Sequence, residues 1–298
     1  MNLRRLPAYL GACARAALTS GPRAYLRMLS RSPYTVKDLP RYGVSMLVDV
    51  RDGAISKPIL ALGDYEAGFA RRLLSAVGPE THFVDVGANI GFFTLAVARR
   101  ADRGHVWSVE PDDRNVRLLR ASLALNGLEG RVEVHHLAAS DANGEVFFST
   151  LGYDALIGSR FTAKDEAALL ARSLAGAAPP TRVPARTVDL LVGDARVDVV
   201  KIDVEGHEPA VLAGMAGVLC RQRPLVFAEF APGTIRHISG TDPAEMLRQV
   251  VACDYALAIV EKSGAVTSLG ADAGAVMARH DDRRHHLDLL LTPRERMG

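Results

Sequence analysis

The sequence predicts an α/β fold with a doubly wound, Rossmann-like sheet that is mostly parallel and has an antiparallel hairpin at its carboxyl-terminal edge. Three observations predict it. The 298 residues are 48% hydrophobic and 23% charged, so the chain can bury a large core. From residue 82 onward, short β-branched and apolar runs alternate with longer helical segments, as in βαβ units. Only a short glycine-rich interval separates the last two apolar runs, which favours a hairpin.

Short apolar segments bounded by turn residues are predicted as strands: residues 82–86, 105–110, 132–138, 197–204, 224–230, 255–260 and 286–291. The segments predicted as helices are residues 91–100, 113–126, 208–221 and 242–253. Asn126 and Gly127 end the second helix as expected for a left-handed cap, and Pro209 lies in a first turn, where its missing N–H group is harmless.

Residues 1–62 are predicted as an addition before the main domain, which we assign to residues 63–298. The addition contains a basic helical segment and short strands at residues 45–50 and 59–62, and a helix with Tyr65, Glu66 and Phe69 follows. An alanine-rich interval at about residues 161–181 is long for a connection. It is predicted to be an insertion, either a lid helix or a disordered loop.

Composition excludes a membrane-spanning protein and a protein built on disulfides or a zinc site. The longest stretch without a charged residue, residues 86–98, has 13 residues, whereas a bilayer-spanning helix needs roughly 18. Three widely spaced cysteines provide neither a disulfide framework nor a zinc site of the usual spacing. A reducing, cytoplasmic location is therefore predicted.

Positive charge is concentrated at the start of the chain. Residues 1–37 contain seven Arg or Lys residues and no acid, whereas a nucleic-acid enzyme more often carries its positive charge around the catalytic body. Nucleic acid is therefore not predicted as a partner. The basic segment is compatible with a helix packed on the main domain, with a peripheral membrane or partner contact, or with targeting. Arg15 interrupts its apolar run, which disfavours a signal peptide.

The first predicted strand ends in the sequence VDVGANIGFFT, which contains Asp85, Gly87 and Gly91. The glycines let the backbone approach a ligand closely, and the helix that begins near Gly91 directs its N–H groups towards an anion. The loop lacks the middle glycine of the dinucleotide fingerprint, and no Gly-Lys-Ser/Thr follows it. Nicotinamide binding and nucleotide hydrolysis are therefore disfavoured.

Acidic residues also end the next two predicted strands. Glu110 lies 25 residues after Asp85, at a position where an acid commonly accepts hydrogen bonds from ribose hydroxyls. Asp141 closes the third strand, where a carboxylate can accept a hydrogen bond from an adenine amine. One acid at a strand end is ordinary, but three in this order are informative.

These segments, together with SVEPDDRN, ASLALNGL and above all VVKIDVEGHEPAVLAGM, resemble the FkbM family of S-adenosylmethionine-dependent methyltransferases. The resemblance runs from about residue 63 to residue 230. It implies a class I methyltransferase fold and S-adenosyl-L-methionine as cofactor. It also implies transfer of a methyl group, typically to a hydroxyl of a sugar or secondary metabolite.

Matched to the family's motifs, Asp85, Gly87 and Gly91 resemble the loop around the methionine part of the cofactor. Glu110 matches the acid that binds the ribose, and Asp141 matches the acid on the adenine side. Three more residues, expected to add polar contacts or to meet the cofactor's ammonium group, are Asn89, Thr94 and Glu66.

An alcohol is a weak nucleophile, so a positioned base would speed its methylation roughly 10²- to 10⁴-fold. Lys201, Asp203 and Glu205 alternate onto one side of the fourth strand before the chain reaches His207. We favour Asp203 as the base or orienting group, and His207 is the second choice because an imidazole is suited to proton transfer. Glu205 is a further catalytic candidate, and Lys201 and Glu229 are expected substrate contacts. Each of these residues also has a purely structural interpretation. The charged side chains could form ordinary ion pairs, and His207 could simply stand at the start of a helix. No metal site is predicted, because alternation along the strand and the turn after it should keep Asp203, Glu205, His207 and Glu208 from all converging on one point.

The sequence therefore predicts a cytoplasmic S-adenosylmethionine-dependent O-methyltransferase. Its expected partner is a small-molecule, carbohydrate or glycolipid acceptor. Two alternatives stay open: an N-methyltransferase, and a non-catalytic subunit that binds the cofactor for a partner.

Overall fold

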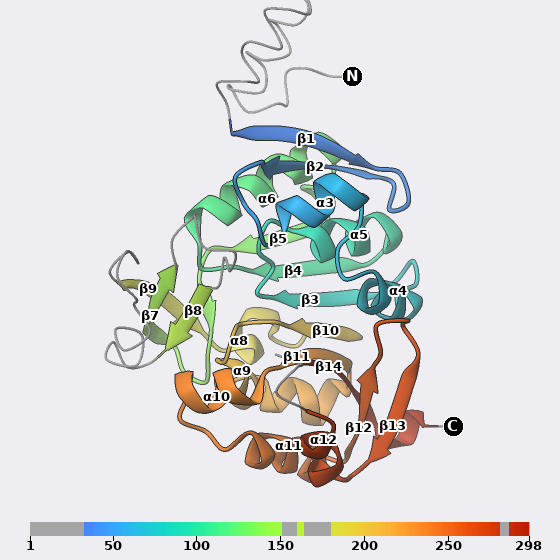
Figure 1. Cartoon of the computed structure of the whole chain (residues 1–298), viewed down its shortest axis with the longest axis vertical. Helices are drawn as coiled ribbons and strands as arrows, with labels where there is room; N and C mark the ends of the chain where they lie inside the picture. The colour runs from blue at the N-terminus through green and yellow to red at the C-terminus, as the bar shows by residue number, and fades with distance from the viewer. Residues whose placement is uncertain (1–32, 151–159, 164–179, 281–285, 298) are drawn as a thin grey trace, which may run out of the picture.

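The computed structural model describes residues 33–150, 160–163, 180–280 and 286–297. At its centre is an eight-stranded sheet with the order β13-β12-β14-β11-β10-β3-β4-β5 (Figure 1). Its strands are β3 (His82–Val86), β4 (His105–Val109), β5 (Val132–His135), β10 (Val199–Ile202), β11 (Leu225–Phe230), β12 (Tyr255–Val260), β13 (Val266–Gly270) and β14 (Leu287–Pro293). The first five are parallel, and β14 is antiparallel to both of its neighbours. The doubly wound, mostly parallel sheet is confirmed.

Helices cover both faces of this sheet and divide the core in two. One core contains side chains from α4 (Ala67–Ser75), α5 (Phe92–Arg100) and α6 (Asp113–Asn126). The other contains side chains from the helices that follow, which are α8 (Val188–Val192), α9 (Glu208–Ala213), α10 (Pro232–Ile238), α11 (Pro243–Ala252) and α12 (Ala273–Arg279). A short 3-10 turn, η3 (Arg294–Arg296), follows β14.

The predicted bounds of α6 are confirmed because both of its ends carry clear capping signals. The Asp112 side chain accepts a hydrogen bond from the Asn115 amide, which satisfies one of the unpaired N–H groups at the start of the helix. Gly127 ends the helix in the left-handed region, with φ 65°.

The N-terminal addition contains one element that the sequence analysis missed and one that it assigned wrongly. β1 (Tyr34–Leu39) was missed and pairs with β2 (Val44–Asp49), which confirms the strand predicted at residues 45–50. The strand predicted at 59–62 is wrong, because these residues belong to α3 (Ser56–Leu62). The Asp52 carboxylate accepts hydrogen bonds from the Ala54 and Ser56 amides and begins the helix.

The predicted strand at residues 132–138 is divided between two sheets. β5 belongs to the central sheet, whereas β6 (Ala138–Ala139) pairs with β9 (Thr181–Arg186). With β7 (Gly144–Thr150) and β8 (Arg160–Ala163), these strands form a second sheet with the order β6-β9-β7-β8, which was not predicted. A continuous apolar run shows that strands are present but does not show which partners they choose.

The predicted helix at residues 208–221 is also divided. α9 ends at Ala213, and a separate π-helical turn, η2 (Val218–Gln222), follows. The Asp189 carboxylate accepts hydrogen bonds from the Gly217 and Val218 amides and starts the second segment. Gly214 packs directly on the Ser140 carbonyl, where a Cβ atom would lie 1.9 Å from the oxygen.

The predicted antiparallel pairing between residues 255–260 and 286–291 is confirmed, but it is not the edge hairpin. β14 lies between β12 and β11, and the edge strand is β13, which was missed together with α12. No helix in the described part of the chain has the length and apolar character needed to cross a membrane. Predictions for the basic segment at residues 1–32 and for most of the alanine-rich interval, residues 164–179, lie outside the described residues.

Candidate functional site

The site lies where the strand order reverses, between β3 and β10. From β3 the chain continues to β4 and β5 on one side, and it then returns to place β10 on the other side of β3. In open α/β sheets, ligands bind at the carboxyl ends of the strands beside such a reversal. The loop after β3 and the turn after β10 therefore define the first region to consider.

The loop after β3 has the shape of a cradle because three of its residues have positive φ. These are Gly87 at 76°, Asn89 at 52° and Gly91 at 90°. A Cβ atom on Gly87 would lie 1.8 Å from the carbonyl oxygen of Asp203, so the loop packs directly on the segment after β10. Only glycine can occupy position 87 in this backbone.

Glu110 closes the far side of this loop, as its spacing predicts. It is 4% exposed. Its carboxylate accepts hydrogen bonds from the Asn89 amide at 2.8 Å and the Asp112 amide at 2.9 Å. A carboxylate has about four acceptor positions, so one held in this way can also accept from the hydroxyls of a ribose.

Asp85 and Thr94 lie beneath the loop and are fully buried. The Thr94 hydroxyl donates to the Asp85 carboxylate at 2.6 Å and lies 2.7 Å from the Ser108 hydroxyl. The other Asp85 oxygen has no hydrogen-bond partner in the described part of the chain and lies 3.7 Å from the Lys201 ammonium. Burial raises the pKa of Asp85. Both residues support the loop from inside, and their direct contact with a ligand stays a prediction.

Lys201 is a buried cation that joins the two halves of the site. Its ammonium donates to the Gly87 carbonyl and to the Asp203 carboxylate, both at 3.1 Å, and it lies 5.3 Å from the centre of the Phe93 ring. Burial lowers the Lys201 pKa, but the charges of Asp203, Asp85 and Glu66 outweigh burial and raise it above its usual value. Its side chain is 4% exposed. It therefore holds Asp203 and the loop, whereas the predicted substrate contact is untested.

We define the acidic cluster as a group of carboxyl groups whose charges act on one another: Glu66, Asp203, Glu205, Glu229 and Asp288. Burial and then the charges of Asp203 and Asp288 raise the pKa of Glu66 to about 8. Burial and the charges of Asp203 and Glu205 raise the pKa of Glu229 well above its usual value. Burial raises the pKa of Asp288 to about 6, although His286 opposes the shift. So many carboxyl groups beside one ammonium make the region suited to a cationic ligand.

Asp203, Glu205 and Glu229 each place a carboxylate oxygen within 4.8 Å of the other two. The sequence analysis named these three separately, and the structure brings them together. It also adds Asp288, which the sequence analysis missed. Asp288 faces Glu229 across the antiparallel pair of β11 and β14. The prediction that no metal takes part is untested.

Glu208 is a second residue that the sequence analysis did not assign to the site. One of its oxygens accepts hydrogen bonds from the amides of Val204 at 3.2 Å and Gly206 at 3.1 Å. These bonds hold the turn in which Glu205 has a left-handed φ of 54°. Burial raises the pKa of Glu208 to about 7.

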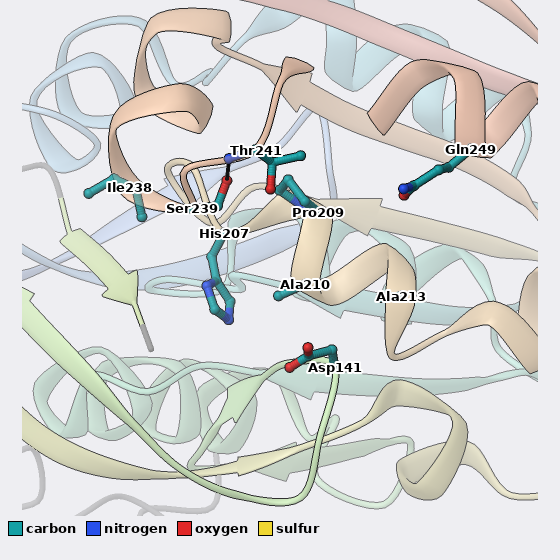
Figure 2. Close-up of a pocket in the computed structure, with 9 residues that line it drawn as sticks. All are labelled: Asp141, His207, Pro209, Ala210, Ala213, Ile238, Ser239, Thr241 and Gln249. Atoms are coloured by element: carbon teal, nitrogen blue, oxygen red, sulfur yellow. Dashed lines mark hydrogen bonds between the residues drawn. The ribbon is translucent and has the colours of Figure 1, made fainter. Parts of the chain in front are cut away.

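The structure places Asp141 and His207 together, at a cavity of about 270 Å³. Figure 2 shows the His207 ring reaching towards the loop that carries Asp141. Ser140 links them, because its hydroxyl donates to the Asp141 carboxylate at 3.2 Å and lies 3.0 Å from Nε2 of His207. The cavity is lined by Asp141, His207, Pro209, Ala210, Ala213, Ile238, Ser239, Thr241 and Gln249. None of the residues of the loop after β3 lines it.

The reversed strand order, the glycine cradle and the buried acid after β4 together define a class I, Rossmann-like methyltransferase. Comparison with known families agrees: the model described as the methyltransferase FkbM domain matches residues 85–257. The chain belongs to this family. It is therefore an S-adenosylmethionine-dependent methyltransferase, and the cradle, Glu110 and the acidic cluster fit a cofactor with a ribose and two positive charges.

Individual relatives are distant. A region of 165 residues, 46% of this chain, is 32% identical to the AMB antimetabolite synthetase AmbE of Pseudomonas aeruginosa and spans 8% of that protein. The crystal structure of the methyltransferase FkbM from Methylobacillus flagellatus KT is 16% identical, with a TM-score of 0.45 over 97% of this chain and 56% of that one. TYW2 from M. jannaschii, in complex with AdoMet, is 14% identical, with a TM-score of 0.44 over 87% of this chain and 84% of that one.

Proposed function

We propose that the enzyme methylates a hydroxyl group of a sugar, glycolipid or secondary metabolite. The observation that carries this proposal is the group of three carboxylates, Asp203, Glu205 and Glu229, beside the glycine cradle. Bound S-adenosylmethionine supplies an electrophilic methyl group. The protein has to hold the acceptor oxygen in line with it and accept the hydroxyl proton.

Asp203 is the preferred proton acceptor because its position is fixed from two directions. Its amide donates to the Val86 carbonyl at 3.0 Å, and its carboxylate accepts from Lys201. The Asp203 side chain is 23% exposed, so an acceptor can reach it, whereas Lys201 is closed off. His207 is the weaker candidate, since it is 2% exposed and faces Ser140.

Glu205 and Glu229 have supporting roles in this proposal. Burial and the charges of Asp203 and Glu205 raise the pKa of Glu229, and in this proposal its carboxyl group contacts the acceptor. Glu205, held by the turn that Glu208 stabilises, orients the hydroxyl. Positioning supplies up to about 7–11 kcal/mol in such reactions, and the base adds roughly 10²- to 10⁴-fold.

The test is methyl transfer from S-adenosylmethionine with a labelled methyl group to a panel of sugars, glycolipids, polyketides and amines. We expect the label on an acceptor oxygen. For Asp203→Asn we expect a rate lower by roughly 10²- to 10⁴-fold, with Asp102→Asn, an exposed change outside the site, as control. Label found only on nitrogen would establish N-methylation instead, because an unprotonated amine needs no base. An unchanged rate in Asp203→Asn would remove Asp203 as the base.

We also propose a cytoplasmic location, no nucleic-acid partner, and contact of the basic segment with an anionic membrane that presents a glycolipid acceptor. The charge of residues 1–37 supports the membrane contact. Co-sedimentation with anionic vesicles should fall when residues 1–31 are deleted. Unchanged co-sedimentation would overturn the proposed membrane contact.

A further inference from the structure

The cavity lined by His207 and Asp141 borders a different part of the hydrophobic core from Lys201, the cation beside the acidic cluster. Lys201 of the acidic region packs over Phe93, in the core formed with α4 to α6. The cavity is walled by α9 and α11, whose side chains belong to the other core. None of the residues of the loop after β3 lines the cavity. The cavity is therefore a different place from the cofactor cradle, although it also lies at the carboxyl end of β10, where ligands bind in such sheets.

Polar groups line the cavity from three separate segments of the chain. Asp141 comes from the loop after β6, His207 from the start of α9, and Thr241 from the connection between α10 and α11 (Figure 2). The side chains of Thr241 and Gln249 have no hydrogen-bond partner within the residues that the structure describes. A hollow with such a wall is occupied by water or by a ligand that replaces it.

The Ser140 hydroxyl lies behind this wall and holds two of its side chains. It connects Asp141 and His207 through contacts of 3.2 Å and 3.0 Å, and Ser140 and His207 are almost fully buried. A buried polar chain of this kind holds its members in one arrangement before a ligand arrives. Preorganised polar groups lower the entropy lost on binding.

The chemistry of the lining selects the ligand class. It contains one carboxylate, an imidazole, two hydroxyls and an amide but no Lys or Arg, so an anionic ligand would lack a cationic partner. Pro209, Ala210 and Ala213 add a small apolar wall along α9. The volume of about 270 Å³ lies just below the roughly 300 Å³ at which drug-sized pockets begin. A ligand of about one ring fits it.

We propose that this cavity is a binding site for a small, uncharged molecule with several hydroxyl groups. In this proposal Asp141, which the family resemblance assigns to the adenine side of the cofactor, binds this molecule instead. The molecule is either the methyl acceptor or a free ligand. The inference does not depend on the proposed O-methylation, because binding here needs no methyl transfer.

The test is saturation-transfer NMR with methyl glucopyranoside as probe and glucose phosphate as its anionic counterpart. We expect the neutral probe to bind the wild-type enzyme and the anionic one to bind about tenfold more weakly or not at all. Ala213→Phe should fill the cavity and abolish the signal. Ala216→Phe, at an exposed position outside the cavity, is the matched control and should bind as the wild type does.

Calorimetry with S-adenosylhomocysteine should give the same affinity for all three proteins, which shows that the variants are folded and that the cavity lies outside the cofactor site. Weaker binding to Ala213→Phe alone would show that the cavity holds part of the cofactor and would overturn the proposal. Equal probe signals from Ala213→Phe and wild type, equal binding of the anionic probe, or no binding of the neutral probe would each overturn the proposal. With S-adenosylmethionine added, methylation of the probe identifies the site as part of the acceptor site. Binding without methylation identifies a free ligand.

Discussion

Replacing Glu66 with Gln should change how cofactor affinity depends on pH. Burial and the charges of Asp203 and Asp288 raise the pKa of Glu66 to about 8. At pH 7 the carboxyl of the cofactor-free enzyme is therefore mostly protonated. It must lose this proton before it can pair with the ammonium group of S-adenosylmethionine, which we predict as its partner.

The size of the effect follows from the pKa. Below its pKa the ionised fraction of Glu66 rises about tenfold per pH unit, so the wild-type affinity should rise about tenfold between pH 6 and pH 7. The cofactor's amino group stays protonated over this range, since its pKa is about 7.7–8.0. In Glu66→Gln the tenfold rise should disappear. At pH 7.5 the lost charge-assisted hydrogen bond, worth about 1.5–3 kcal/mol, should weaken binding roughly ten- to hundredfold.

Isothermal titration calorimetry measures this directly. Titrations at several pH values, in two buffers with different ionisation enthalpies, give both the affinity and the number of protons released. The wild type should release close to one proton more than Glu66→Gln. Glu80→Gln, at an exposed position, serves as the control. Equal pH slopes for wild type and Glu66→Gln would refute the reasoning.

Three further predictions concern stability. Gly87→Ala should lower the free energy of unfolding by about 2–5 kcal/mol, because the new Cβ meets the Asp203 carbonyl. Gly63 also has a positive φ but has open space around it, so Gly63→Ala should lower the free energy of unfolding by only about 1 kcal/mol. Urea unfolding of both variants measures the difference. Lys201→Met should lower the free energy of unfolding by about 3–5 kcal/mol in the same assay, since Asp85 and Asp203 lose their buried cation. A decrease of less than about 1 kcal/mol would contradict this prediction. Glu208 has a folded-state pKa of about 7, above the usual 4.5, so its contribution to stability is complete below pH 4.5 and is lost as pH rises to about 7. The free energy of unfolding of Glu208→Gln should therefore rise by about 3 kcal/mol relative to that of the wild type between pH 4.5 and pH 7. If the difference in stability between the two proteins does not change with pH, the pKa of Glu208 is ordinary.

Seven of the eight strands of the central sheet could be predicted from sequence because their apolar runs are local signals, whereas β13 was missed. Gly127, for example, ends α6 in the left-handed region, as its sequence predicts. Predictions failed where side chains outside an apolar run decide its structure. Residues 59–62 are apolar enough for a strand, but the Asp52 side chain starts a helix that includes them.

The candidate site shows the same division. Gly87 and Glu110 follow strands directly, so sequence spacing places them correctly beside each other. Asp288 could not be found in this way, because it reaches the acidic cluster only through the pairing of β14 with β11. Glu208 and Ser140 act through side-chain hydrogen bonds to residues whose positions depend on the folded chain.

The most direct test of the account is calorimetric titration of the wild type, Glu110→Ala and the exposed control Glu129→Ala with S-adenosylmethionine. Glu110 is buried beside the Asn89 amide and is assigned to the ribose. Loss of charge-assisted hydrogen bonds of about 1.5–3 kcal/mol should weaken binding by at least roughly tenfold in Glu110→Ala. The control should bind as tightly as the wild type. Equal affinity for wild type and Glu110→Ala, with both folded, would contradict the placement of the cofactor.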